Sequence, residues 1–337
     1  MSRVLIIAEA GVNHNGDIHL AKKLAAAAKD CGADIVKFQT AKLESLVTDY
    51  APMAEYQKEN VKSAALQKEM IRKLLLTYEE FVELSEYCGE IGIRFLSTPF
   101  DTDSIDFLAG IGCTLWKIPS GEITNYPYLV KIAKFHQPII LSTGMSTLKE
   151  VEDAVELLKN NGAGEVTLLH CTTEYPAPFK DVNLKALKTL RDKFECPVGY
   201  SDHTSGIEIP IAAVGMGAVI IEKHFTLDQN MEGPDHKASL EPDELKMMVS
   251  AIRNIEEAMG DGIKRPFSGE ISNMAAARKS IVAKCAIRTG ERLTEENLTT
   301  KRPGTGINPM RWNEVIGKTA DRDYEADEML QLPLTET

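Results

Sequence analysis

The sequence lacks the features that mark several large classes of protein. No apolar run is long enough to span a bilayer, and the run at residues 4–8 is too short for the apolar core of a signal peptide. The six cysteines form no Cys-x-x-Cys pair, so we expect reduced thiols rather than disulfides or a zinc site. Acidic residues outnumber basic ones, and the formal net charge of −12 opposes binding to nucleic acids or anionic membranes. These absences predict a cytoplasmic protein that binds neither nucleic acid nor membrane.

Two nucleotide-binding fingerprints are also missing. No Gly-x-Gly-x-x-Gly turn follows the first predicted strand, and the segment Gly11-x-x-x-x-Gly16 is not followed by Lys and Ser or Thr. The chain instead alternates short apolar runs with helical periods. Because each of eight predicted strands is followed by a helix, we expect an α/β protein with a (β/α)8 TIM barrel, and an open doubly wound sheet is the alternative. The strands are expected at residues 4–8, 34–39, 94–97, 115–118, 138–142, 166–171, 198–203 and 219–224.

The alternation stops near residue 260, which predicts the domain organisation. Residues 1–260 would form the barrel, and residues 261–277, where the pattern breaks up around several glycines, serines and a proline, would form a linker. Short strand-like pieces separated by turn residues follow, so residues 278–337 are expected to form a small, mainly β domain. Its loop at 301–306 concentrates cationic and flexible residues.

Every predicted barrel strand ends in polar side chains. In a barrel these strand ends meet at one face, where such folds carry their chemistry. Side-chain alternation along a strand has a period of two, so paired polar residues point to the same side. The pairs are Lys37 with Gln39, Ser201 with His203, and Glu222 with His224.

Two neighbouring predicted strands each end in a histidine, His203 and His224. Taken singly, either histidine is explained by a local hydrogen bond, but the repeated placement favours a site for one divalent ion. Two imidazoles and no thiolate favour Mn²⁺ or Mg²⁺ over a closed zinc site. Lys37 and Lys117 at the same face would hold a phosphate. The combination predicts carbon–carbon or phosphoryl chemistry on an anionic small molecule.

Short segments along almost the whole chain resemble signature segments of the sialic acid synthase family, and the C-terminal domain resembles the antifreeze-like (SAF, β-clip) domain of these enzymes. The segments are 9–16, 36–40, 96–100, 117–122, 141–145, 169–172, 200–204, 222–226, 233–235 and 301–304.

The resemblance implies condensation of phosphoenolpyruvate with an N-acetylmannosamine-type sugar to give a nine-carbon 2-keto acid and phosphate. It implies His203 and His224 as metal ligands and a domain-swapped homodimer in which Arg302 contacts the acyl group in the partner's site. Phosphoenolpyruvate would contact Lys37, Thr98, Lys117, Ser120, Ser142, Thr173 and Ser201, although some members have Asn where this chain has Thr173. The amino sugar would contact Glu9, Gln39, Glu122, Tyr175, Asp235 and Arg302. The catalytic residues would be Glu9, Lys37, Lys117 and Glu222, with the proton of the added water going to Glu222 or to a hydroxide on the metal.

The acceptor sugar and the reaction class have alternatives. The sequences of residues 9–17 and 233–242 most resemble those of the legionaminic acid branch of the family. This resemblance implies a 2,4-diacetamido-2,4,6-trideoxy-mannose acceptor and N,N'-diacetyllegionaminic acid as the product. An N-acetylneuraminate synthase using N-acetylmannosamine is the first alternative. Another metal-dependent barrel aldolase or hydrolase, and a non-catalytic carbohydrate-binding or ice-binding protein, are less favoured.

Overall fold

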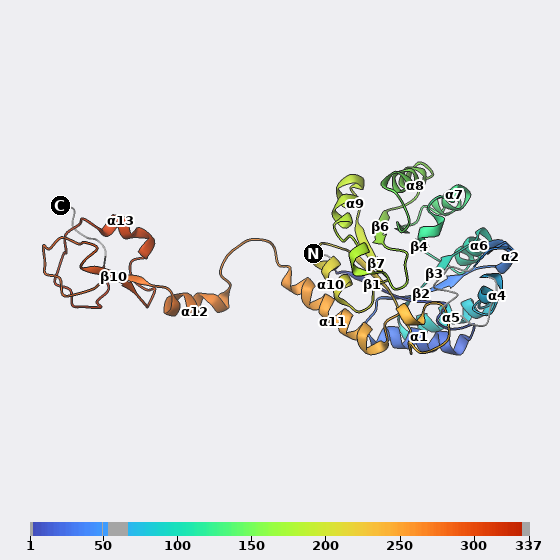
Figure 1. Ribbon diagram of the computed structural model, residues 1–337, viewed down its shortest axis with the longest axis horizontal. Coiled ribbons are helices and arrows are strands. Elements are labelled where there is room, and N and C mark those ends of the chain that lie inside the picture. Colours follow the sequence, from blue (N-terminus) through green and yellow to red (C-terminus); the bar gives the residue numbers. More distant parts are fainter. Residues whose placement is uncertain (1–2, 49, 53–66, 332–337) are drawn as a thin grey trace. The chain divides into compact units, whose positions relative to one another are not determined.

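The computed structural model describes residues 3–48, 50–52 and 67–331, and the chain divides into two compact units, Met1–Gly260 and Asp261–Thr337. In the first unit a ring of parallel strands is surrounded by helices (Figure 1). Its strands are β1 (Leu5–Gly11), β2 (Ile35–Thr40), β3 (Arg94–Pro99), β4 (Trp116–Ile118), β5 (Ile139–Ser142), β6 (Val166–Cys171), β7 (Val198–Asp202) and β8 (Ile220–His224).

The strand order shows a barrel rather than an open sheet. Parallel ladders follow the order β3-β2-β1-β8-β7-β6-β5-β4, and β3 and β4, at the two ends of that order, also lie side by side. The first strand pairs with both the second and the last, so that Glu9 lies opposite Lys37 on one side and His224 on the other. The expected (β/α)8 barrel is therefore confirmed.

Several barrel helices begin at side chains that cap them. The Asp17 side chain caps the first helix, and Thr77 and Glu80 form a capping box at the start of α5. The stretch at residues 66–76 has a helical pattern in the sequence, and α4 (Gln67–Arg72) lies within it; residue 66 is outside the described part. The helices are α1 (Ile18–Asp30), α2 (Leu43–Leu46), α4 (Gln67–Arg72), α5 (Tyr78–Ile91), α6 (Thr102–Gly110), α7 (Tyr126–Ala133), α8 (Leu148–Asn160), α9 (Ala186–Phe194), α10 (Glu208–Gly215) and α11 (Pro242–Ala258). Over the described residues, no helix has both the length and the apolar character needed to cross a membrane.

The interior of the barrel is layered. One layer is aliphatic and consists of Ile7, Ile35, Leu96, Leu115, Ile140, Leu169 and Ile220. On strand β7 the matching position is Gly199, where an added Cβ would lie 2.5 Å from the Ile220 carbonyl oxygen. Two residues further along most strands the inward side chain is charged or carries a hydroxyl, with Cys171 on β6 as the exception. We call the charged and hydroxyl-bearing set the polar layer. The polar layer consists of Glu9, Lys37, Thr98, Lys117, Ser142, Ser201 and Glu222.

The second unit has its own small core and an antiparallel pair of strands, β9 (Ser280–Ala283) and β10 (Leu298–Lys301). Strand β10 was not predicted, because only Leu298 of its four residues is buried. The expected linker 261–277 contains helix α12 (Ser268–Ala277), which the sequence analysis missed. None of its residues is buried, so it lacks the apolar periodicity that predicts a helix. A short helix, α13, spans Trp312–Val315.

A buried ion pair joins β7 to β8 on the helix side of the barrel wall. Lys223 and Asp202 are both fully buried, with the ammonium nitrogen 2.6 Å from a carboxylate oxygen. The same ammonium donates to the Thr204 carbonyl, and Asp202 accepts hydrogen bonds from the Tyr200 hydroxyl and the Thr204 backbone nitrogen. Each member of the pair directly precedes one of the two strand-end histidines. The pair therefore fixes the backbone from which both imidazoles project.

We expect Lys223→Met to lower the free energy of unfolding of the barrel by about 3–5 kcal/mol, because it leaves the Asp202 carboxylate buried without its cation. Urea unfolding followed by circular dichroism measures the change. The matched control is Lys188→Met, which removes an exposed lysine paired with Asp192 and should leave stability unchanged. Equal stability of Lys223→Met and the wild type would contradict the role assigned to the buried pair.

Candidate active site

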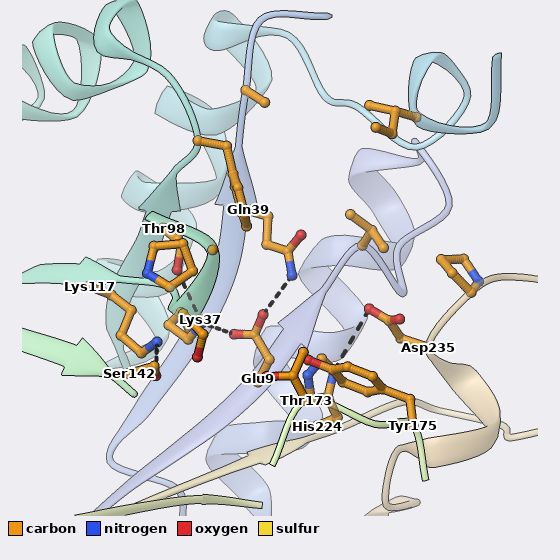
Figure 2. Close-up of a pocket in the computed structure, with 18 of the residues that line it drawn as sticks. Glu9, Lys37, Gln39, Thr98, Lys117, Ser142, Thr173, Tyr175, His224 and Asp235 are labelled. Carbon is orange, nitrogen blue, oxygen red and sulfur yellow. Dashed lines mark hydrogen bonds and ion pairs between the residues drawn. The ribbon is translucent and has the colours of Figure 1, made fainter. Parts of the chain in front are cut away.

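One pocket opens at the C-terminal ends of the barrel strands. Its volume of about 310 Å³ is at the lower end of the roughly 300–1,000 Å³ usual for small-ligand sites. The polar layer forms its base. Figure 2 shows Lys117, Ser142 and Thr98 on one side of Glu9, and Asp235, His224 and Tyr175 on the other. The residues from the sequence analysis that line the pocket are Glu9, Lys37, Gln39, Thr98, Lys117, Ser120, Ser142, Thr173, Tyr175, Ser201, His203, Glu222, His224 and Asp235.

Two lysines and two glutamates of the polar layer neutralise one another. The Lys37 ammonium lies 2.6 Å from Glu9 and 3.5 Å from Glu222, and Lys117 lies 3.6 Å from the other oxygen of Glu222. Each of these side chains is at most 6% exposed. A buried ammonium without a partner is costly, so the carboxylates keep both lysines charged in the interior.

Burial and charge act in opposite directions on these groups. Burial alone would raise the pKa of Glu222, but Lys117 and Lys37 outweigh it and hold that pKa at about 2. Burial raises the pKa of Glu9 despite the opposing effect of Lys37, because Glu222 adds to the rise. Burial lowers the pKa of Lys117, only partly offset by Glu222. Glu222 is therefore the permanent counter-charge of the cluster.

Hydroxyl groups surround the two ammonium groups. Lys37 donates to Thr98 Oγ1 at 3.1 Å, and Lys117 donates to Ser142 Oγ at 2.7 Å. Ser201 Oγ donates to Glu222 Oε1 at 2.9 Å. Each of these hydroxyls can turn to an incoming oxygen anion, so together with the ammonium groups they form an anion-binding group.

A second set of small groups borders the same end of the pocket. The Gly144 amide donates to Ser120 Oγ at 2.9 Å, and a Cβ at Gly144 would lie 2.2 Å from Thr173 Oγ1. Glycine is therefore required there by the close approach. Thr173 Oγ1 is buried and has no hydrogen-bond partner among the described residues. An unsatisfied buried hydroxyl beside a pocket is available to a ligand.

The two histidines face each other at the opposite end. The ring centres of His203 and His224 are 5.3 Å apart, a separation that one ion with ordinary nitrogen–metal bonds of about 2.0–2.1 Å can bridge. His203 Nδ1 lies 2.6 Å from the Thr172 carbonyl oxygen and therefore carries the proton, which leaves Nε2 with its lone pair. His224 Nδ1 is buried without a hydrogen bond to any described residue.

Both imidazoles are neutral near pH 7, as metal binding requires. Burial lowers the pKa of His203, and burial together with His203 lowers the pKa of His224 well below its ordinary value. Within the described part of the chain, no group of three or more histidine, cysteine, aspartate or glutamate side chains is placed to hold a metal. The residues thus fit an open site with two protein ligands and positions left for substrate oxygens.

Polar groups suited to a sugar lie around the histidines. The ring of Tyr175 lies 4.2 Å, centre to centre, from that of His203 with the planes tilted by 38°, and it meets His224 edge-on at 5.6 Å. Asp235 lies 3.9 Å from His224, and burial together with Glu9 raises its pKa to about 7. Gln39 donates to Glu9 at 3.0 Å. This region can both donate and accept hydrogen bonds, as sugar hydroxyl and amide groups require.

One residue of the barrel that was expected at the sugar, Glu122, does not line this pocket. Glu122 lies on the 3₁₀ turn Ser120–Glu122, and its carboxylate accepts a hydrogen bond from Asn125 Nδ2 at 2.6 Å. Because β4 has already ended at this point, the alternation of side chains along a strand could not predict which way the Glu122 side chain points. Arg302 belongs to the second unit.

Sequence reasoning missed the apolar part of the pocket. Aliphatic side chains from the connection between β2 and α5 line it together with one residue after β1. These side chains, which we call the apolar wall, are Val12, Leu46, Val47, Ile71, Leu74 and Leu75. The only sequence signal was the leucine run at 74–76, which is equally typical of a core helix.

Comparisons with known proteins agree with this geometry. The NeuB family model matches residues 24–264, and the SAF domain model matches residues 278–333. The chain is 55% identical over 333 residues to N,N'-diacetyllegionaminic acid synthase of Campylobacter jejuni, covering 98% of this chain and all of that one. It is 49% identical to the protein of the same name from Legionella pneumophila, over 95% of this chain and 91% of that one.

A solved structure is similar along most of the chain. The crystal structure of N-acetylneuraminic acid (sialic acid) synthetase from Leptospira borgpetersenii in complex with citrate has a TM-score of 0.73 and 37% sequence identity, covering 81% of this chain and 90% of that one. The expected family and C-terminal domain are thereby confirmed. The chain belongs to the NeuB family and carries a SAF domain after its barrel.

Proposed function

We propose that this protein condenses phosphoenolpyruvate with a 2,4-diacetamido-2,4,6-trideoxy-mannose to give N,N'-diacetyllegionaminic acid and phosphate. The main support is the 55% identity, over nearly the full length of both chains, to a protein named for that product. The pocket supports the same reaction, because a group of buried cations and hydroxyls lies beside two metal-competent imidazoles. N-acetylmannosamine is the competing acceptor, since the structural relative named for N-acetylneuraminic acid is 37% identical.

Each region of the pocket has a part in this reaction. The anionic groups of phosphoenolpyruvate bind to Lys37, Lys117 and the hydroxyls around them, and the amino sugar binds beside Glu9, Gln39, Tyr175 and Asp235. A divalent ion held by His203 and His224, Mn²⁺ or Mg²⁺, would supply polarisation of the aldehyde oxygen of the sugar. The residues assigned to phosphoenolpyruvate are Lys37, Thr98, Lys117, Ser120, Ser142, Thr173 and Ser201.

The bonds change in two stages. C3 of phosphoenolpyruvate forms a bond to the aldehyde carbon of the sugar, and water then adds to C2. The adduct breaks its C2–O bond to the phosphoryl group, which leaves the keto acid and inorganic phosphate. Lys37 and Lys117 stabilise the charge on the departing phosphate. The two protons of the water end on the new hydroxyl of the sugar and on the released phosphate, while Glu222, whose pKa is held at about 2, stays ionised as the counter-charge of Lys37 and Lys117.

Product analysis tests the reaction and the acceptor together. The protein is incubated with phosphoenolpyruvate, Mn²⁺ and each candidate sugar, and products are identified by mass spectrometry while phosphate is measured. We expect stoichiometric phosphate and N,N'-diacetyllegionaminic acid, with a higher kcat/KM for the diacetamido sugar. If phosphoenolpyruvate is not consumed with either sugar, the proposal is refuted. If the protein prefers N-acetylmannosamine, the reaction class stands but the proposed acceptor is wrong.

We expect His203→Ala and His224→Ala each to abolish metal-dependent turnover while the protein stays folded, because each removes one of the two protein ligands. Mn²⁺ binding measured by electron paramagnetic resonance should weaken by at least about tenfold in each variant. The control is His19→Ala, which removes an exposed histidine of α1. Full activity of the wild type after treatment with a chelator would show that these imidazoles serve another purpose.

We also propose that Arg302 acts in the site of a partner subunit within a domain-swapped homodimer. Arg302 is exposed, and it forms no hydrogen bond or ion pair with any residue in the described ranges. The loop that follows is fixed within the second unit: Ser280 donates to the Pro303 carbonyl at 2.6 Å, and the Gly304 amide donates to the Ala275 carbonyl at 2.8 Å. An unpaired guanidinium on an anchored loop is suited to binding an acyl oxygen.

Subunit mixing tests this arrangement. Inactive Arg302→Ala and His203→Ala proteins, mixed under conditions that allow exchange, should recover about a quarter of wild-type activity, because half the dimers are mixed and each mixed dimer has one intact site. Mixing His203→Ala with His224→Ala should recover none, since both changes fall in the same barrel. Absence of recovery in the first mixture, with exchange verified by differently tagged subunits, would refute the swap.

A further inference from the structure

The apolar wall is larger than phosphoenolpyruvate requires. Phosphoenolpyruvate is compact and highly charged, and the polar layer already supplies cations and hydroxyls for it. The apolar wall adds aliphatic side chains from several segments to the same pocket. Val12 and Ile71 pack on the buried side chains of Met70 and Leu74, so this surface is held in place by its own small cluster. An ordered apolar surface in a pocket calls for an apolar part of a ligand.

The position of the apolar wall assigns it to the sugar. Val12 directly follows Gly11, and a Cβ at Gly11 would lie 3.1 Å from both Glu9 Oε1 and Gln39 Nε2, the polar groups beside the sugar. Leu46 and Val47 come from the connection that follows β2, beyond Gln39. Lys117 and Ser142 lie on the far side of Glu9 from Asp235 (Figure 2). The apolar wall thus borders the sugar end rather than the phosphate end.

Most of the apolar wall comes from a connection, between β2 and α5, that is longer than the barrel fold requires. Residues 100–101 are enough to connect β3 to α6, whereas residues 41–77 separate β2 from α5. Extra length in a βα connection at this face of a barrel adjusts substrate recognition rather than the fold.

The two candidate acceptors differ in apolar groups. The 2,4-diacetamido-2,4,6-trideoxy sugar carries two acetyl methyl groups and a methyl group at C6. N-acetylmannosamine carries one acetyl methyl group, with hydroxyls at C4 and C6. A methyl group placed on an aliphatic surface is stabilised by leaving water, whereas a hydroxyl placed there loses its hydrogen bonds.

We infer that the apolar wall selects the acceptor by contacting the C6 methyl and acetyl methyl groups of a diacetamido-trideoxy sugar, with Val12 and Leu75 as specificity-determining residues. The inference rests on the proposed function and deepens it. Chemistry at C1 of the sugar and phosphate release are left to the polar layer and the histidines.

Two near-isosteric variants test the inference, Val12→Thr and Leu75→Asn, which introduce polar groups without opening a large cavity. The kcat/KM is measured for the diacetamido-trideoxy sugar and for N-acetylmannosamine, with the KM for phosphoenolpyruvate as an internal reference. We expect the ratio of the two kcat/KM values to fall by roughly tenfold in each variant, within the range of about 10–200-fold for one methyl-sized contact. The KM for phosphoenolpyruvate should not change.

Two matched controls carry the same Val→Thr and Leu→Asn substitutions at positions outside the pocket. Val82→Thr on α5 and Leu148→Asn at the start of α8 alter partly exposed side chains, 36% and 39% exposed, that do not line the pocket. Both should keep the wild-type ratio. Folding of every variant is verified by its melting temperature.

The outcomes separate the inference from the proposed function. If the wild type prefers the diacetamido sugar and both variants keep its ratio, or lose activity equally on both sugars, the apolar wall does not select the acceptor and the inference fails while the function stands. If the wild type prefers N-acetylmannosamine, the proposed acceptor and the inference fail together. A fall of the ratio in the two wall variants, with unchanged controls, supports the inference.

Discussion

Two ammonium groups and two carboxylates share one layer of the barrel interior, and the chemistry of the pocket depends on their balance. Lys37 and Lys117 stay charged in a buried place only because Glu9 and Glu222 lie within 2.6–3.6 Å of them. The oxygen atoms of an entering anion can replace carboxylate oxygens of Glu9 and Glu222 as partners of the two ammonium groups. In a protein whose overall charge is negative, Lys37 and Lys117 thus place two buried cations in a pocket that a small anion can enter.

This balance requires strands that are held in a fixed register. The aliphatic layer beneath the polar layer fills the barrel, and Gly199 leaves room in it for Leu169 and Ile220. On the outer side of the wall, the buried pair of Lys223 and Asp202 joins the two strands that carry the histidines. The same two strands thus direct imidazoles inward and an ion pair outward, so packing of the helix layer and the geometry of the two imidazoles are coupled.

Much of this arrangement could be predicted from local sequence. The alternation of strands and helices predicts the barrel, and the period of two along a strand correctly directs Lys37, Ser201 and Glu222 into one pocket. The rule fails where the strand ends, as at Glu122, whose direction is set by the 3₁₀ turn and the hydrogen bond from Asn125. Helix α12 has no buried face, so periodicity gives no signal for it. The apolar wall depends on packing between segments far apart in sequence, which no local pattern encodes.

The two halves of the pocket differ in how freely they can vary. The polar layer is tied to closure of the barrel, since every member stands on a strand whose neighbours must stay in register. Most residues of the apolar wall belong to the connection between β2 and α5, which does not contribute to closure of the barrel. Substitutions among the described residues of this connection can therefore change the shape of that side of the pocket while the polar layer stays in register.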